Sequence, residues 1–142
     1  MSKVAEFIKV LYDATAKSNT FGRLLKNVQL ISAENGKCKA EFEVAEEHLN
    51  YAGTLHGGCT STLVDCISTY ALMSYKDKGL PGVSVDLHVT FLKAAFPGDV
   101  ILIDAKTIKA GRTMAFLEVE LTKKKDGAIV ARGIHTKFIG GK

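Results

Sequence analysis

The chain has 142 residues, of which 46% are hydrophobic and 24% charged, a balance that excludes an intrinsically disordered protein. Its length suits one domain with a single core, so we predict one domain over 1–142. The formal net charge is +4, with lysine and arginine spread over the whole chain, which favours an anionic ligand and makes nucleic acid an improbable partner.

The chain also lacks the marks of secretion and of a bound metal. No apolar run approaches the roughly 20 residues of a membrane span, and the N-terminus lacks the apolar core of a secretory signal. We therefore expect a soluble intracellular protein without a transmembrane segment. The basic bias of residues 1–26 is compatible with a mitochondrial as well as a cytoplasmic location. Cys38, Cys59 and Cys66 have no spacing typical of disulfides or ligands, so we expect reduced cysteines and no metal site.

Hydrophobic periodicity predicts a helix at the N-terminus and a hairpin after it. Apolar residues recur at helical spacing over 4–16, and this helix is expected to end near 18–19. A strand-like stretch over 24–33 and an alternating stretch over 37–44 lie on either side of Asn35-Gly36, which is a strong signal for a two-residue hairpin turn.

A second helix and four more strands are predicted in the rest of the chain. Residues 59–75 form a helix of small and apolar residues in which Asp65 is the only charge before Ser74, and such a helix is normally enclosed. The strand patterns that follow, separated by glycine and proline turns, cover 83–92, 100–108, 113–122 and 128–138.

This order of elements, with its short turns, demands antiparallel neighbours. The economical fold is α+β: one curved antiparallel sheet of about six strands wraps around the central helix. Residues 1–19 are then an extra N-terminal helix, and 20–142 form the core of the domain.

The most informative segment is the start of the central helix, where His56-Gly57-Gly58 is followed by Asp65. Backbone N–H groups at a helix start are unpaired and lie at the positive end of the helix dipole, so they can hold an oxyanion. A buried carboxylate must be paired, hydrogen-bonded or used chemically, and no lysine or arginine lies within a turn of Asp65. Each residue alone is explained more simply by a tight turn, a cap or a local hydrogen bond. Their combination favours a catalytic site.

Helix geometry adds a constraint on this site. Eight residues of α-helix rise about 12 Å, whereas an oxyanion donor and an attacking group must both lie roughly 3 Å from one reacting centre. Gly57 and Asp65 of one chain therefore cannot act on the same substrate. If both act, Asp65 must meet Gly57 of the partner subunit, which two antiparallel central helices across a two-fold axis would achieve.

These motifs resemble the hotdog-fold thioesterases of the 4-hydroxybenzoyl-CoA thioesterase type. The resemblance covers nearly the whole chain through Gly-Thr-Leu-His-Gly-Gly at 53–58, Leu-Val-Asp at 63–65, Pro-Gly-Val-Ser-Val-Asp at 81–86, Ala-Phe at 95–96 and His-Thr-Lys at 135–137. It implies hydrolysis of medium- to long-chain fatty acyl-CoA to free fatty acid and CoA. It also implies a dimer of dimers, with phosphatidylcholine-transfer protein as a further partner, and no cofactor beside the CoA thioester.

The same resemblance assigns roles to five residues. Asp65 acts as general base or nucleophile, and Gly57 of the partner subunit donates its N–H to the oxyanion. Asn50 and His56 orient the thioester, and Ser84 positions the attacking water. A cysteine nucleophile is disfavoured, because neither Cys59 nor Cys66 has an obvious base beside it in the sequence.

The phosphates of CoA require cations near the cleft. A glycine turn with two positive charges can offer backbone N–H groups and charge to phosphates, and we predict such a turn at Lys109, Gly111, Arg112 and Thr113. The other residues that we assign to the CoA-binding surface are Asp86, Phe91, Lys93 and Lys137. Strict alternation over 83–92 places Ser84, Asp86 and His88 on one polar face. Lys123, Lys124 and Lys125 are expected at a solvated hairpin tip.

Two other functions are compatible with the same fold. A hotdog dimer could bind acyl-CoA or regulate a partner without catalysis, but pure binding has no need of a carboxylate at the depth of Asp65. The dehydratase branch of hotdog proteins pairs a catalytic histidine with an acid in a different pattern, whereas His56 lies in the glycine turn of this chain.

Overall fold

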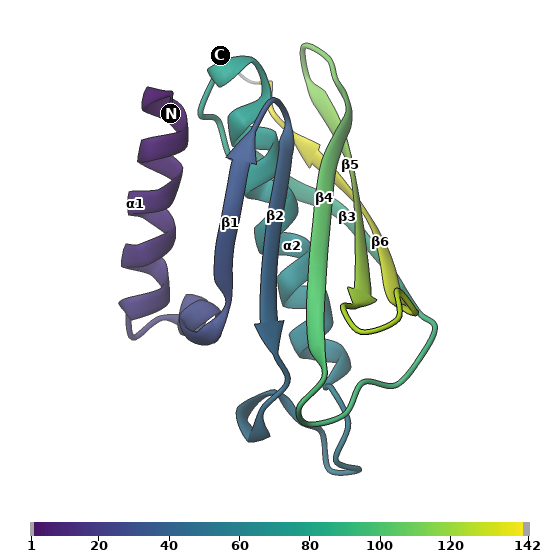
Figure 1. Ribbon diagram of the computed structural model, residues 1–142. Helices are drawn as coiled ribbons and strands as arrows, with labels where there is room; N and C mark the ends of the chain where they lie inside the picture. The colour runs from purple at the N-terminus through teal and green to yellow at the C-terminus, as the bar shows by residue number, and fades with distance from the viewer. Residues whose placement is uncertain (1, 141–142) are drawn as a thin grey trace.

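The computed structural model describes residues 2–140 and consists of a curved antiparallel sheet around one long helix (Figure 1). The six strands follow the order β1-β2-β4-β5-β6-β3. The helices are α1 (Lys3–Lys17) and α2 (Gly57–Ser74), with short 3₁₀ turns η1 (Phe21–Asn27), η2 (Glu46–His48) and η3 (Tyr75–Asp77). The strands are β1 (Gln29–Glu34), β2 (Lys37–Glu43), β3 (Val83–Phe91), β4 (Val100–Ala110), β5 (Met114–Lys123) and β6 (Ile129–Phe138). The predicted α+β fold is confirmed.

One predicted element is wrong in part, because residues 24–27 belong to the 3₁₀ turn η1 and β1 begins only at Gln29. The buried residues Leu25 and Val28 lie three apart, which suits a tight helical turn better than a strand. Tyr12 of α1 fixes this turn, since its hydroxyl lies at hydrogen-bond distance from the carbonyl oxygens of Leu25 and Val28.

Helix α1 covers one side of the sheet near β1 (Figure 1). The Ser2 hydroxyl caps its start by accepting a hydrogen bond from the Ala5 N–H at 3.0 Å. Ile8, Tyr12 and Ala16, spaced four apart, form its buried stripe. These features place the predicted N-terminal helix where it closes the open side of the core.

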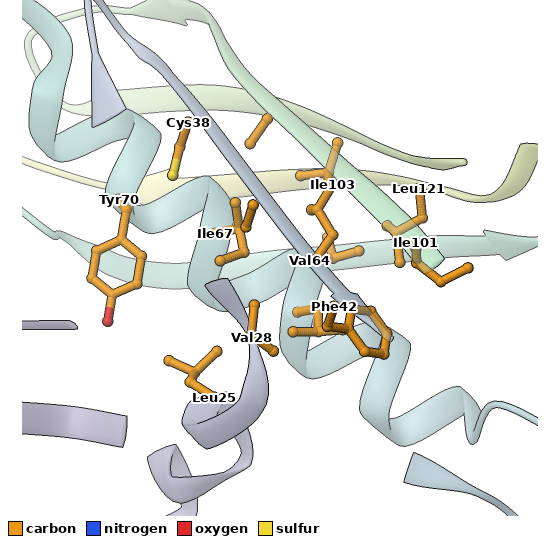
Figure 2. Close-up of a cluster of buried hydrophobic side chains, with 14 of the residues drawn as sticks. Leu25, Val28, Cys38, Phe42, Val64, Ile67, Tyr70, Ile101, Ile103 and Leu121 are labelled. Carbon is orange, nitrogen blue, oxygen red and sulfur yellow. The ribbon is translucent and has the colours of Figure 1, made fainter. Parts of the chain in front are cut away.

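The apolar residues of α2 form the centre of the core, but the helix is not fully enclosed: Asp65, expected to be buried, lies on a face that is only half-buried. Val64 and Ile67 of α2 lie among Phe42 of β2, Ile103 of β4 and Leu121 of β5 (Figure 2). No helix among residues 2–140 is long and apolar enough to cross a membrane.

The close approach of α2 to β6 depends on a glycine. A Cβ atom built on Gly133 would lie 2.4 Å from Cγ1 of Val64, a distance that real side chains do not tolerate. Gly133 therefore lets the helix lie directly on the strand, and it brings the next inward-facing residue of β6, His135, under the middle of α2.

The prediction of a solvated tip at residues 123–125 is wrong for Lys123. Its side chain is only 5% exposed, and its Nζ lies 3.1 Å from Oδ2 of Asp99. The inward face of β5 runs through Leu117, Val119 and Leu121 to Lys123, so strand alternation carries this lysine into the interior.

The two edge strands of the sheet are β1 and β3. β3 pairs only through its β6 side, and most of its apolar side chains, including Val83, Val85 and Phe91, are exposed. A free strand edge with exposed apolar side chains is a template for pairing with another chain.

Candidate active site

A cleft of about 420 Å³ opens at the N-terminal end of α2. It is bounded by Asn50 of the preceding loop, Gly57 and Thr60 of the helix, and the segment that follows β3. Phe91 and Lys93, assigned to the CoA-binding surface from the sequence, both line it. Four of the predicted site residues therefore lie in one cleft: Asn50, Gly57, Phe91 and Lys93.

The two glycines at the helix start have different neighbours. His56 is the N-cap of α2, and its Nδ1 accepts a hydrogen bond from the Gly58 N–H at 2.8 Å. A Cβ atom on Gly58 would lie 3.0 Å from this ring nitrogen, so the second glycine makes room for the cap. The Gly57 N–H has no hydrogen-bond partner among residues 2–140, and this free donor at the positive end of a helix can hold an oxyanion.

The capping bond also assigns the proton of His56. Because Nδ1 is an acceptor, the neutral ring carries its proton on Nε2. The side chain is exposed and does not line the cleft of this chain, although it directly precedes the cleft residue Gly57.

Asn50 is more occupied than its predicted role suggests. Its Oδ1 accepts hydrogen bonds from the backbone N–H groups of Ala52 at 2.9 Å and Thr54 at 3.1 Å, and its Nδ2 donates to Oγ1 of Thr54 at 2.9 Å. Asn50 therefore closes its own loop. An amide nitrogen has two protons, so one donor remains for a ligand.

Asp65 lies two turns further along α2, at a half-buried position next to strand β6. Its carboxylate is 47% exposed, and Oδ1 lies 3.8 Å from Nε2 of the fully buried His135 on β6. His135 is bonded at both ring nitrogens: Nδ1 lies 2.8 Å from Oγ of Ser68, and Nε2 lies 2.7 Å from Oγ of Ser84.

The hydrogen bonds determine which atom of this group carries each proton. The Ser68 hydroxyl donates to the Asp65 carbonyl at 3.1 Å, so Nδ1 of His135 must donate to Ser68. Nε2 then accepts from the Ser84 hydroxyl, which leaves the lone pairs of Ser84 Oγ open toward a water molecule. Burial lowers the pKa of His135, although the Asp65 carboxylate acts to raise it, and this favours the neutral ring that such an arrangement requires.

Ser84 reaches His135 only because β3 contains a β-bulge between Ser84 and Asp86. Ser84 pairs with the inward-facing Lys137, while Asp86 pairs with Thr136 on the other face. The predicted common polar face of Ser84, Asp86 and His88 is therefore wrong. An extra residue in one strand switches the side chains after it to the opposite face.

Lys137 is buried below Asp65 and is absent from the cleft lining. Its Nζ donates a hydrogen bond to Oγ1 of Thr69 at 2.8 Å, and Thr69 Oγ1 in turn donates to the Asp65 carbonyl at 2.8 Å.

Burial raises the pKa of the Cys66 thiol, next to Asp65 in the chain, to about 11, and it likewise raises the pKa of Cys59 to about 11. Both thiols are therefore protonated at neutral pH and unsuited as nucleophiles.

The predicted phosphate turn lies away from the cleft. Lys109, Gly111, Arg112 and Thr113 are exposed where β4 turns into β5, at the end of the sheet opposite the start of α2 (Figure 1). Within one chain, three separate sites therefore follow one another along the direction of α2. They are the cleft at Gly57, the group around Asp65 and the basic turn between β4 and β5.

His135 and Ser68 are the residues of this group whose roles the sequence did not predict. The signal was present in β6, where alternation puts Ala131, Gly133, His135 and Lys137 on one face. Two polar residues that continue an inward-facing apolar row mark a polar site in the interior.

Comparisons with known proteins agree with this architecture. A family model described as "Thioesterase superfamily" matches residues 52–130. Acyl-coenzyme A thioesterase 13 of Homo sapiens is 44% identical over 140 residues, covering 99% of this chain and 99% of that protein. The crystal structure of zebra fish thioesterase superfamily member 2 has 47% identity and a TM-score of 0.92, covering 98% of this chain and 100% of that chain.

A more distant structure was solved with a ligand. The hypothetical thioesterase protein of Streptococcus pneumoniae TIGR4, solved with coenzyme A, is 31% identical with a TM-score of 0.76, covering 82% of this chain and 88% of that chain. The matched family model spans more than half of the chain, and the human relative spans nearly all of it. The chain therefore belongs to the thioesterase superfamily and has its hotdog fold.

Proposed function

We propose that this protein hydrolyses fatty acyl-CoA thioesters of medium to long chain length to free fatty acid and CoA, without a cofactor. The observation that carries the proposal is the half-exposed carboxylate of Asp65 beside the Ser84–His135–Ser68 hydrogen-bond chain. A carboxylate next to a hydroxyl with open lone pairs is an arrangement that can hold and deprotonate a water molecule.

In the proposed reaction, Asp65 takes a proton from water while the water oxygen attacks the thioester carbonyl carbon. The carbonyl oxygen becomes an oxyanion and accepts the Gly57 N–H of the partner subunit, with the His56 Nε2–H and the Asn50 amide orienting the thioester. Collapse of the intermediate breaks the carbon–sulfur bond, and the departing thiolate takes the proton back from Asp65 and leaves as CoA thiol. Direct attack by Asp65, through an Asp65–acyl anhydride that water opens, is the other route. Label found in Asp65 after a single turnover in ¹⁸O-labelled water would establish it, since water activation leaves Asp65 unlabelled.

A homodimer is the proposed catalytic unit. Gly57 and Asp65 are eight residues apart in the regular helix α2, a rise of about 12 Å, so one chain cannot bring both to one carbon. The free edge of β3, with its exposed Val83 and Val85, offers a surface for pairing with a second copy. Two such dimers would form the proposed tetramer.

Two features support CoA as the leaving group. The basic turn at Lys109 and Arg112 and the cleft residue Lys93 provide exposed cations for phosphates. Relatives point the same way: one is named acyl-coenzyme A thioesterase 13, and another was solved with coenzyme A.

The test is an initial-rate survey of the purified protein over acyl-CoA substrates from acetyl to palmitoyl, measured as thiol release. We expect turnover with the medium and long chains, and a loss of at least about 10²-fold in kcat for Asp65→Asn. Asp104→Asn, which removes an exposed carboxylate from the outer face of β4, is the matched control and should keep wild-type rates. Tight acyl-CoA binding without thiol release would instead support a non-catalytic binding protein.

A further inference from the structure

Lys137 links strand β6 to the helical turn that carries Asp65. Its side chain is 4% exposed, and its Nζ donates to Oγ1 of Thr69 at 2.8 Å. Thr69 lies one turn after Asp65 and donates its own hydroxyl proton to the Asp65 carbonyl at 2.8 Å. The chain of bonds therefore runs from the ammonium through one hydroxyl to the backbone of Asp65.

This burial does not suit the phosphate role assigned to Lys137 from the sequence. A CoA phosphate is strongly hydrated, and moving it to a buried ammonium between strand and helix would cost far more than binding it at an exposed lysine. Lys93 and Lys109 are exposed and serve that purpose better.

The charges around Lys137 point to Asp65 as its counterpart. Burial lowers the pKa of Lys137, whereas Asp65 and Cys66 on α2 act to raise it. The other titratable group on its side of β6 is His135, which also faces Asp65 and, from β3, Asp86. Of these groups, Asp65 is the carboxylate whose charge acts to raise the pKa of both buried basic residues of β6, His135 and Lys137.

We propose that Lys137 is a positioning residue for Asp65: through Thr69 it fixes the helical turn that carries the carboxylate. The role rests on the proposed hydrolysis by Asp65. Lys137 does not touch the substrate, so its loss should weaken the chemical step and leave binding intact.

The test compares two variants that separate the bond from the charge. Lys137→Met removes both, and Thr69→Val removes the hydrogen bond while keeping the shape of the side chain and the charge of Lys137. For both we expect kcat to fall about 10- to 100-fold with KM unchanged, as for other losses of alignment. Lys124→Met, at an exposed position of the β5–β6 hairpin, is the matched control.

A second measurement needs no substrate. In protein labelled with ¹³C at the aspartate carboxyls, the Asp65 resonance is the one missing from the Asp65→Asn spectrum. We expect this resonance to move at constant pH in both Lys137→Met and Thr69→Val, because the bonds that hold the helical turn of Asp65 are lost, and to stay in place in Lys124→Met. This readout remains decisive if the wild-type protein proves inactive, a result that would refute the proposed function alone.

Three results would overturn the proposal. An Asp65 carboxyl resonance that is unchanged in both variants removes the positioning role whatever the kinetics show. A raised KM with wild-type kcat means that Lys137 binds CoA directly. Wild-type kcat in Thr69→Val means that the bond to Thr69 has no part in alignment, and this variant decides the question if Lys137→Met does not fold.

Discussion

Asp65 and Asp99 show how surroundings separate an open carboxylate, the proposed base, from one whose oxygens are bonded within the fold. Asp99 accepts the Phe96 N–H at 2.9 Å and forms ion pairs with Lys123 at 3.1 Å and Lys125 at 3.4 Å. The Phe96 hydrogen bond and these lysines lower the pKa of Asp99, whose oxygens are fully used. At Asp65 the hydroxyls bind the backbone carbonyl instead, so the carboxylate stays open to a ligand.

Lys109 and Arg112 are the residues that we expect to hold the CoA phosphates. If these contacts are equally strong in the ground and transition states, the double variant Lys109→Ala, Arg112→Ala should raise KM about 10-fold or more with little change in kcat. Steady-state kinetics at low salt measure both constants. Lys39→Ala, Lys106→Ala removes the same charge from the outer sheet face and should keep KM. An unchanged KM in the first variant would move the phosphate site elsewhere.

At the scale of the element, small departures from regular strands direct the polar groups. The bulge in β3 turns Ser84 inward while Asp86 stays outside, and the glycine of β6 lets α2 lie close enough for Ser68 to reach His135. The hydrogen-bond chain next to Asp65 thus depends on three elements held in one register.

The contact between Gly133 and α2 predicts a sharp loss of stability for Gly133→Ala. The added methyl group would lie 2.4 Å from a Val64 methyl, and overpacking of this kind costs about 1–3 kcal/mol. Urea unfolding measures the change in free energy. Val64→Ala removes the opposing atoms, so the double variant should lose less stability than the sum of the two single variants. Additive losses would show that the helix and strand separate freely.

The loop before α2 predicts a loss of stability in acid. His48 is buried, its Nδ1 accepts the Ala45 N–H at 3.0 Å, and its carbonyl accepts the His56 N–H at 2.8 Å. Burial lowers the pKa of His48 below its ordinary value, as it does for His135, although Glu47 acts to raise it. The unfolded chain therefore binds more protons, and stability falls as pH drops through the unfolded histidine pKa near 6.5, by at most about 1.4 kcal/mol per pH unit for each group.

Urea midpoints at pH 7.5 and 5.5 measure this dependence. His48→Asn keeps an acceptor for the Ala45 N–H but does not titrate, so its midpoint should fall less between the two pH values than that of the wild type. His88→Asn, at an exposed position of β3, should keep the wild-type dependence. A His48→Asn protein as acid-sensitive as the wild type would assign the effect to other groups.

In the proposed mechanism the whole molecule carries two half-sites per chain. The cleft at Gly57 would hold the oxyanion donor and the surface at Asp65 the base, on one continuous helix. Only a second copy can bring a cleft and a base together, because the helix keeps its own two groups apart.

Mixed dimers test this arrangement. A Gly57→Val side chain would press on the Phe91 ring, which lies 3.4 Å from the Cβ position, and block the cleft. Refolding this inactive variant with inactive Asp65→Asn gives mixed dimers in which one of two sites is intact. With random pairing about half of the dimers are mixed, so activity should recover to roughly a quarter of wild type. No recovery, with mixed dimers proven by mass spectrometry, would place both groups in one chain's site.

The sequence by itself determined the order of elements and most of their bounds. Periodicity is a local property, and it identified α1, α2, the Asn35-Gly36 turn and the strands, as well as the isolated charge of Asp65. It also supported the separation of Gly57 and Asp65, since helix rise follows from the residue count alone. The resemblance to a known family supplied the roles that local pattern cannot assign.

Only the tertiary structure decided which polar groups surround Asp65. His135 and Lys137 are about seventy residues away from Asp65 along the chain, and Ser84 reaches His135 through a bulge that strict alternation cannot reveal. Likewise, the inward orientation of Lys123 could be understood only once the fold showed Asp99 beside it. Contacts of this kind depend on strand register and on which face is buried, and both are set by packing between distant segments.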